Sequence, residues 1–345
     1  MIIKNELLST PEVVAHAAQL SMANLVSYTQ DSSFPVVEYI KSLMQADVLG
    51  SDSAASAITA ALAASSVEKR AFVPIAYPDP AAVREAASVR MPVVIFAAAN
   101  PESVMPLRDA GCIIVFCESH QELLDTIIRS FKVCGDNKVL LPCVVVWDGP
   151  LDYSEPLSLP SDQIIKNFLP PLKMPHKLDM KNPSHLGHYG VHARQQQQKA
   201  MESVFKIAAA VDENWNKKFK RSWPAVEKHQ ADDAELLLVT YGYHSSTAKA
   251  AVNALRAQGK KVGLVRIRIY RPFPLHALSL LKEKKVAVLD FAASPGAPSP
   301  LYQEIKSLAK FSLSFISLDK YLSEKNFAEI FAKLEKAEKE EVYWL

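Results

Sequence analysis

The stretch KVGLVRIRIYRPFP, residues 261–274, decides the fold of this chain. From Val265 to Tyr270, aliphatic residues alternate with two arginines and an aromatic residue. This is the two-residue period of a strand and predicts one continuous strand here. Pro272 and Pro274 end the predicted strand, because proline donates no ladder hydrogen bond and restricts the residue before it.

A helix and another strand precede this stretch. Gly259 stands where a helix commonly ends with a glycine cap. Before that glycine, apolar residues recur at helical spacing, namely Ala248, Ala251, Val252 and Leu255. The apolar run LLLV at residues 236–239 is typical of a buried strand. Strand, helix and strand in this order indicate a βαβ unit, and therefore a parallel sheet covered by helices.

Length and composition restrict the class of protein. A chain of 345 residues with 49% hydrophobic content is long enough for two domains with their own cores. A net charge of +2 argues against nucleic acid as a partner. No apolar run is long enough for a membrane span, and the N-terminus MIIKNELLST lacks a signal-peptide core. We therefore expect a cytoplasmic protein with neither a nucleic-acid nor a membrane partner.

Three residue types limit the cofactors that the chain can hold by itself. Its 4 cysteines form no CxxC pair, so we expect buried thiols and no iron–sulfur cluster on this chain. Only 10 residues are glycine, which leaves few loops able to cradle a phosphate. The histidines at 185, 188 and 192 are helically spaced, but no cysteine or carboxylate accompanies them, so we expect no metal site.

The predicted elements divide into three segments. Residues 1–172 form one α/β domain, 173–230 form a linker with a polar, solvated helix, and 231–345 form a second α/β domain. In the first segment we expect helices at 10–25, 35–44, 53–65 and 121–133 and strands at 25–28, 71–75, 92–99, 112–116 and 143–147. In the second domain we expect further helices at 274–284, 301–310 and 324–340 and strands at 286–290 and 313–317. The strands are continuous apolar runs, as expected for a sheet covered on both faces.

The order LLLVTYG, helix, KVGLVRIRIYRPFP, short helix, VAVLD resembles the second domain of one subunit type. This is the alpha subunit of the pyruvate / 2-oxoacid:ferredoxin (flavodoxin) oxidoreductase family. The segments FLPP at 168–171 and KAME at 199–202 are similar to its inter-domain region. The resemblance implies two doubly wound domains, the first of the pyrimidine-binding thiamine diphosphate type and the second like the C-terminal domain of transketolase.

The resemblance also implies a function for the assembled complex. It would oxidise and decarboxylate a 2-oxoacid such as pyruvate to an acyl-CoA, with coenzyme A as co-substrate and reduction of ferredoxin. Thiamine diphosphate and Mg²⁺ would lie at the interface with a beta subunit. Iron–sulfur clusters would reside on the beta subunit and on ferredoxin-like or gamma subunits. We expect this chain alone to bind none of these cofactors.

Family site positions map onto unusual residues in this sequence. The substrate-facing hydroxyl falls on Asp31, and the glutamate that contacts the aminopyrimidine falls on Ser51. Asp52 could replace that glutamate only if the chain slips by one residue, and its side chain is shorter. The carboxylate-clamping arginine falls on Pro101, beside Asn100. The resemblance thus assigns Asp31, Ser51 and Asp52 to the cofactor and Asn100 to the substrate.

These departures leave the function open and no catalytic residue assigned. The chain is either an active alpha-type subunit or a catalytically silent structural or regulatory paralogue. Between these two lies a subunit with an altered substrate, such as one that lacks a simple carboxylate clamp. The segment YGYHSST, residues 241–247, also follows a predicted strand, where α/β proteins bind ligands. Its serines could cap the next helix or contact an anion or a partner.

Overall fold

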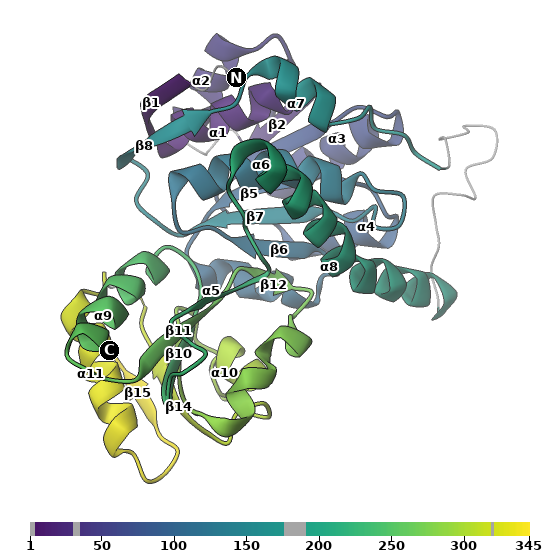
Figure 1. The fold of residues 1–345 in the computed structure, drawn as a ribbon. Helices are drawn as coiled ribbons and strands as arrows, with labels where there is room; N and C mark the ends of the chain where they lie inside the picture. The colour runs from purple at the N-terminus through teal and green to yellow at the C-terminus, as the bar shows by residue number, and fades with distance from the viewer. Residues whose placement is uncertain (1–3, 30–34, 176–190, 319–320) are drawn as a thin grey trace.

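The computed structural model describes residues 4–29, 35–175, 191–318 and 321–345. Two α/β bodies lie against each other, the first built mainly from the N-terminal half and the second from the C-terminal third (Figure 1). The described helices include none that is long and apolar enough to cross a membrane.

A seven-stranded sheet forms the centre of the first body, in the order β12-β6-β7-β5-β4-β2-β3. Its six N-terminal strands are parallel, as the continuous apolar runs predict. They are β2 (Leu25–Thr29), β3 (Asp47–Ser51), β4 (Ala71–Ile75), β5 (Val94–Ala98), β6 (Ile113–Phe116) and β7 (Cys143–Trp147). A separate antiparallel pair, β1 (Lys4–Ser9) and β8 (Ser154–Leu159), lies beside this sheet.

Helices cover both faces of this sheet. Neighbouring residues of one strand point to opposite faces, so they show which helices pack on each face. Phe72 belongs to a core with residues of α1 (Thr10–Leu20), α2 (Pro35–Leu43) and α6 (His120–Cys134). Its neighbour Val73 belongs to the core formed with α3 (Ala54–Ser66) and α4 (Pro80–Ser88). The prediction of a sheet covered on both faces is confirmed.

The second body holds a six-stranded sheet in the order β15-β14-β13-β10-β11-β9. Its strands are β9 (Val226–His229), β10 (Leu236–Thr240), β11 (Val262–Ile267), β13 (Lys285–Asp290), β14 (Phe311–Ile316) and β15 (Val342–Trp344). All are parallel to their neighbours except β9. Helix α9 (Ser245–Ala257) connects β10 to β11 and completes the predicted βαβ unit. The remaining helical segments are η3 (Leu275–Glu283), α10 (Pro300–Ile305) and α11 (Glu324–Lys336).

The stretch at 261–274 differs from its prediction, because it contributes to both sheets. Strand β11 ends at Ile267, and the next strand, β12 (Ile269–Arg271), pairs antiparallel with β6 of the first body. The break falls at Arg268, whose backbone N–H donates to Ala225 O while its carbonyl accepts from Phe116 N. Alternation alone cannot show this change of sheet, since every residue from 262 to 270 is buried.

Helix α8 (Val191–Phe219) contains the predicted helix through the glutamine run, three of whose four residues are exposed, but it also has a buried face that was not predicted. The glutamine run at 195–198 suggested a solvated helix, yet one face of α8 is buried against the first body. The buried apolar residues of α8 lie four or seven positions apart: Ala200, Val204, Val211, Trp215 and Phe219. Phe168 of α7 (Asp162–Phe168) packs on Trp215, with 5.0 Å between ring centroids. The helix is therefore amphipathic.

Several boundaries differ from the sequence prediction. The first helix ends at Leu20, because Met22 adopts a left-handed backbone with φ 55°. The segment expected as a helix at 274–284 is 3₁₀ over Leu275–Glu283, and the helix expected to reach 310 ends at Ile305. Five strands escaped prediction, namely β1, β3, β8, β9 and β15. Each is short or lies at a sheet edge, where the hydrophobic pattern is weak.

Candidate functional site at the carboxyl edges of the two sheets

The carboxyl ends of the parallel strands lie along one edge of the first sheet. In the sheet order, the chain leaves β2 toward β3 on one side and leaves β4 toward β5 on the other side. The topological switch therefore lies between the adjacent strands β2 and β4. Strand β2 pairs with β3 over all five residues but with β4 only at Leu25 and Val26. The strands β2 and β4 therefore part toward this edge, which is where open α/β sheets bind ligands.

Two of the three residues assigned to the cofactor lie in the described part of this edge. Ser51 ends β3, is 9% exposed, and its Oγ lies 3.4 Å from Ser27 Oγ. Asp52 follows it and is exposed, directly before Ser53, the N-cap of α3. Asp31 lies outside the described residues. At the position that the resemblance matches to the family's glutamate, the structure thus has a buried hydroxyl, and the acid that follows it in sequence is exposed.

Asn100 lies elsewhere on the same edge. It follows β5, and its Oδ1 accepts hydrogen bonds from Ser103 N at 3.1 Å and Ser103 Oγ at 2.7 Å. Asn100 is therefore the N-cap of the short helix α5 (Pro101–Val104), with Pro101 at the first helical position. Strands β4 and β2 separate β5 from β3, and three strand spacings amount to about 14 Å. The fold does not bring Asn100 next to Ser51.

Instead, Asn100 lines a pocket of about 280 Å³ between the two bodies. Strands β5 and β7 of the first sheet and β10, β13 and β14 of the second end at this pocket. The carboxyl edges of both sheets therefore converge here. Its lining residues are Asn100, Pro101, Glu102, Asp148, His244, Phe291, Ser317, Leu318 and Tyr321.

Asp148 contacts the second body directly. Its Oδ1 accepts the backbone N–H of Tyr243 at 2.8 Å. Gly242 has φ +76°, and a Cβ there would lie 2.2 Å from Asp148 Oδ2, so only glycine allows this approach. Burial raises the pKa of Asp148 to about 7, although the Tyr243 hydrogen bond acts in the opposite direction. The carboxyl group can therefore exchange a proton near neutral pH.

His244 forms the opposite wall of the pocket. It is 8% exposed, and its ring stacks on Phe291 with 4.9 Å between centroids. Burial lowers the pKa of His244 to about 4, so the imidazole is neutral at pH 7. His244 is the N-cap of α9 without a side-chain capping bond, and Ser245 follows as the first helical residue. The serine cap considered for residues 241–247 is therefore wrong.

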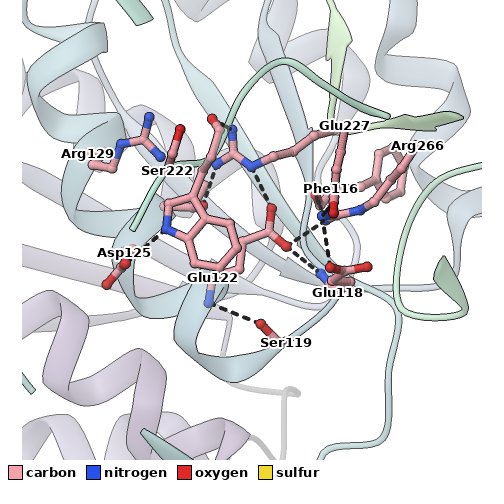
Figure 2. A network of polar contacts seen from close by, with 12 residues as sticks. Phe116, Glu118, Ser119, Glu122, Asp125, Arg129, Ser222, Glu227 and Arg266 are labelled. Atoms are coloured by element: carbon pink, nitrogen blue, oxygen red, sulfur yellow. Dashed lines mark hydrogen bonds and ion pairs between the residues drawn. The ribbon is translucent and has the colours of Figure 1, made fainter. Parts of the chain in front are cut away.

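Buried ion pairs connect the two bodies across their interface (Figure 2). The two arginines of the KVGLVRIRIYRPFP stretch meet Glu122 of α6. Arg266 Nη2 lies 2.6 Å from Glu122 Oε2, and Arg268 Nε lies 2.5 Å from Glu122 Oε1. Arg266 also contacts Glu118 at 3.3 Å and Glu227 at 3.1 Å, and Lys249 pairs with both of these glutamates. Sequence reasoning placed the arginines on a strand face and missed their partners.

A second buried acid attaches the inter-domain segment to the first body. Asp125 accepts hydrogen bonds from two indole nitrogens, those of Trp215 and Trp223, each at 2.9 Å. Arg221 adds a bidentate contact to the same carboxylate at 2.7 and 2.9 Å. Helix α8 and the segment that follows it are thereby fixed on α6.

The other candidates for chemistry have little structural support. Cys112, Cys117, Cys134 and Cys143 are all buried, as the sequence predicts, and burial raises the pKa of Cys112 to about 12. His185 and His188 lie outside the described residues. Among the described residues no group of three or more His, Cys, Asp and Glu side chains could hold a metal ion.

Comparison with known proteins defines the class. Residues 82–214 match the family model "Pyruvate flavodoxin/ferredoxin oxidoreductase, thiamine diP-bdg", and 234–319 match "Pyruvate:ferredoxin oxidoreductase core domain II". The fold is similar to that of a 2-oxoglutarate:ferredoxin oxidoreductase from Magnetococcus marinus, with a TM-score of 0.75 at 13% identity. That likeness covers 96% of this chain and 65%, less than two thirds, of the other. Two α/β bodies of the thiamine-enzyme type, the fold class expected from the sequence, are therefore present.

Sequence relatives identify the subunit type. Pyruvate synthase subunit PorA of Methanothermobacter thermautotrophicus is 31% identical, over 90% of this chain and 88% of its own length. The alpha subunit of an NADH-dependent phenylglyoxylate dehydrogenase from Aromatoleum evansii is 30% identical, over 83% of this chain and 78% of its own. The chain belongs to the pyruvate:ferredoxin oxidoreductase family, as an alpha-type subunit of a 2-oxoacid:ferredoxin oxidoreductase. The first family match begins at residue 82, so it includes Asn100 but not Ser51.

Proposed function

We propose that the complex containing this chain oxidises a 2-oxoacid such as pyruvate to an acyl-CoA in the cytoplasm, with reduction of ferredoxin. Its similarity to PorA along nine-tenths of the chain carries this proposal. The relative that acts on phenylglyoxylate is almost equally similar, so the side chain of the 2-oxoacid is the least constrained feature.

For the cofactor, we propose a shared site with a beta subunit. That subunit would supply the diphosphate and Mg²⁺ contacts, and ferredoxin-like or gamma subunits would carry iron–sulfur clusters. This chain would supply the edge at β2 and β3, with Asp31, Ser51 and Asp52 nearest the pyrimidine. Thiamine diphosphate supplies, when bound, a carbanion that attacks the 2-oxo carbon.

The described residues only partly fit that role. Ser51 offers a buried hydroxyl, which can make one hydrogen bond but cannot act as a carboxylate would. Asp52 is exposed, and Pro101 begins α5 where the family has a carboxylate-binding arginine. We therefore assign no proton-transfer step to this chain.

We keep as a second candidate a silent paralogue that retains the fold and the assembly, because the residues that the resemblance matches to the site are unusual. In that case the ion pairs between the two bodies would be needed for assembly, whereas Ser51 and Asn100 would not be needed for turnover. Both candidates require a beta subunit, and they differ only in whether this chain contributes to a working site.

Reconstitution distinguishes the two candidates. The chain should be co-expressed with beta and gamma subunits, and 2-oxoacid-dependent ferredoxin reduction measured in the purified complex. An active subunit predicts turnover that needs this chain and falls when Ser51 is replaced by alanine. A silent paralogue predicts stable assembly without turnover. Substituting Asp31→Thr, Ser51→Glu and Pro101→Arg together would then create activity, provided these positions face the cofactor. Failure to assemble with any beta subunit would contradict both candidates.

A further inference from the structure

Asp148, which is half-buried, has fewer hydrogen-bond donors than the fully buried acids of the described chain. Glu122 forms ion pairs with two arginines, and Asp125 accepts hydrogen bonds from one arginine and two indole groups. Asp290 accepts from the Tyr241 hydroxyl at 2.5 Å and from the backbone N–H of Leu301 at 2.6 Å and of Ala292 at 3.2 Å. In the described part of the chain, Asp148 accepts from one other residue, the backbone N–H of Tyr243.

The carboxylate of Asp148 also lacks a nearby counter-charge among the described residues. Among the described residues, Arg266 is the one cation that acts on it electrostatically, and Arg266 is already engaged by Glu118, Glu122 and Glu227. Partial burial of a carboxylate without a cation or further donors is costly, and proteins normally satisfy such groups. Asp148 faces a pocket, so a ligand can supply what the chain does not.

The walls of the pocket indicate the chemistry of that ligand. No lysine or arginine is among its described lining residues, whereas Asp148 and Glu102 are both acidic. Three rings line it, those of His244, Phe291 and Tyr321. The hydroxyl of Ser317, in a residue only 1% exposed, has no hydrogen-bond partner in the described part of the chain. This combination disfavours anions and favours a cationic hydrogen-bond donor.

We propose that the pocket binds a small primary ammonium group, with Asp148 as its counter-charge and Ser317 as a further hydrogen-bond acceptor. Aromatic faces stabilise such cations when water is excluded. The volume of about 280 Å³ lies below the usual range for drug-sized ligands and suits a short amine or the end of one side chain. The ammonium group belongs either to a free amine or to a lysine of a partner subunit. The inference does not depend on the proposed 2-oxoacid chemistry.

Binding should follow the ionisation of Asp148. With its pKa near 7, the carboxylate fraction rises about tenfold between pH 6 and pH 8. Burial keeps His244 neutral over this range, since its pKa is about 4. The pKa of the Tyr243 phenol is raised by burial, so Tyr243 also stays uncharged, while Glu102 lies at the exposed rim. An alkylammonium ion should therefore bind about tenfold more tightly at pH 8 than at pH 6.

The test uses the full chain and three ligands of equal size: propylammonium, 1-propanol and propionate. Saturation-transfer NMR titrations give the relative affinities. We expect propylammonium to bind most tightly, 1-propanol weakly and propionate least. Asp148→Asn should weaken propylammonium at least tenfold and abolish the pH dependence, whereas Asp152→Asn, at an exposed acid nearby, should change neither. Ser317→Ala, expected to weaken binding several-fold, tests the same pocket if the Asp148 variant does not fold.

Three results would overturn the proposal. These are equal binding of propionate and propylammonium, unchanged affinity in Asp148→Asn, and no binding of any of the three ligands at 100 mM. Repeating the titration with the assembled complex identifies the source of the ammonium group. Retained propylammonium binding indicates a free amine as the natural ligand. Loss of binding, together with weaker assembly of Asp148→Asn, indicates a lysine of the partner.

Discussion

Arg266 and Glu122 form an ion pair of 2.6 Å in which both side chains are almost completely excluded from water, at 1% and 0% exposure. The arginine belongs to the second body and the glutamate to α6 of the first, so the pair crosses their interface. Replacing Glu122 by glutamine would leave Arg268 without its carboxylate and Arg266 with only its weaker partners. We expect a loss of about 3–5 kcal/mol in the free energy of unfolding, measured by urea denaturation.

An exposed ion pair within the second body, to which Arg266 belongs, provides the control. Asp233 makes a bidentate contact with Arg256 at 2.7 and 2.8 Å, but its side chain is 71% exposed. Solvent screens such a pair, so Asp233→Asn should cost far less than Glu122→Gln. Equal losses in the two variants would mean that the buried pair has no special role in joining the bodies.

The same glutamate should make stability depend on pH in acid. Burial alone would raise the pKa of Glu122, but Arg266 and Arg268 together lower it below its ordinary value. The stabilisation is therefore complete above the unfolded-state pKa of about 4.3 and is lost as the pH falls through the lower folded-state pKa. Unfolding free energies measured from pH 6 to pH 3 should fall more steeply for the wild type than for Glu122→Gln. Parallel curves would contradict this assignment.

The KVGLVRIRIYRPFP stretch shows which features of the fold a sequence pattern can predict and which it cannot. Apolar runs and helical spacing predicted the parallel strands and the βαβ unit correctly, because burial on both faces demands such runs. The same alternation concealed the transfer from one sheet to the other at Arg268. Alternation records which way a side chain points, but it carries no information on which strand lies beside it.

The candidate site was less predictable than the fold, for a similar reason. Asn100 could be placed at a strand end from sequence, but its partner in the pocket, His244, is 144 positions further along the chain. Asp148 directly follows a predicted strand, yet burial raises its pKa, and its contacts with Gly242 and Tyr243 come from the other body. Whether Asp31, Ser51 and Asp52 contact a cofactor stays a prediction, as do the boundaries of the three segments.

Asp125 should control the docking of α8. Its carboxylate, which is completely buried, accepts bonds from Trp215, Trp223 and Arg221. Asp125→Asn removes the charge that satisfies the guanidinium and offers only one oxygen to these donors. We expect a loss of about 3 kcal/mol and a red-shifted tryptophan emission, because Trp215 gains access to water. Asp109→Asn, at a carboxylate that is 72% exposed, should leave both measurements unchanged.

Asp148 should reduce stability above neutral pH. Its unfolded-state pKa is about 3.9 and its folded-state pKa about 7, so the folded state binds more protons between these values. Stability therefore falls as the pH rises from about 4 to 7, and the loss is complete above 7. Asp148→Asn removes this penalty and should raise the unfolding free energy at pH 8 by about 1–3 kcal/mol, with little effect at pH 4. A variant that is less stable than the wild type at pH 8 would show that the carboxylate is already satisfied.

The isolated chain should not bind thiamine diphosphate measurably, even with Mg²⁺ present. Its 10 glycines leave few loops that could cradle a diphosphate, and Ser51, which the resemblance matches to the family's glutamate, supplies only a hydroxyl. One hydrogen bond and some stacking do not offset the cost of ordering a flexible, charged ligand. A ligand present at one hundred times its Kd would stabilise the fold by about 2.7 kcal/mol, a shift of a few degrees in Tm. We expect no shift with millimolar cofactor beyond that seen with pyrophosphate alone.

A clear rise in Tm specific to the cofactor would show that this chain holds the pyrimidine unaided. Asp52→Asn would then be the first variant to measure, because Asp52 directly follows Ser51 in the sequence.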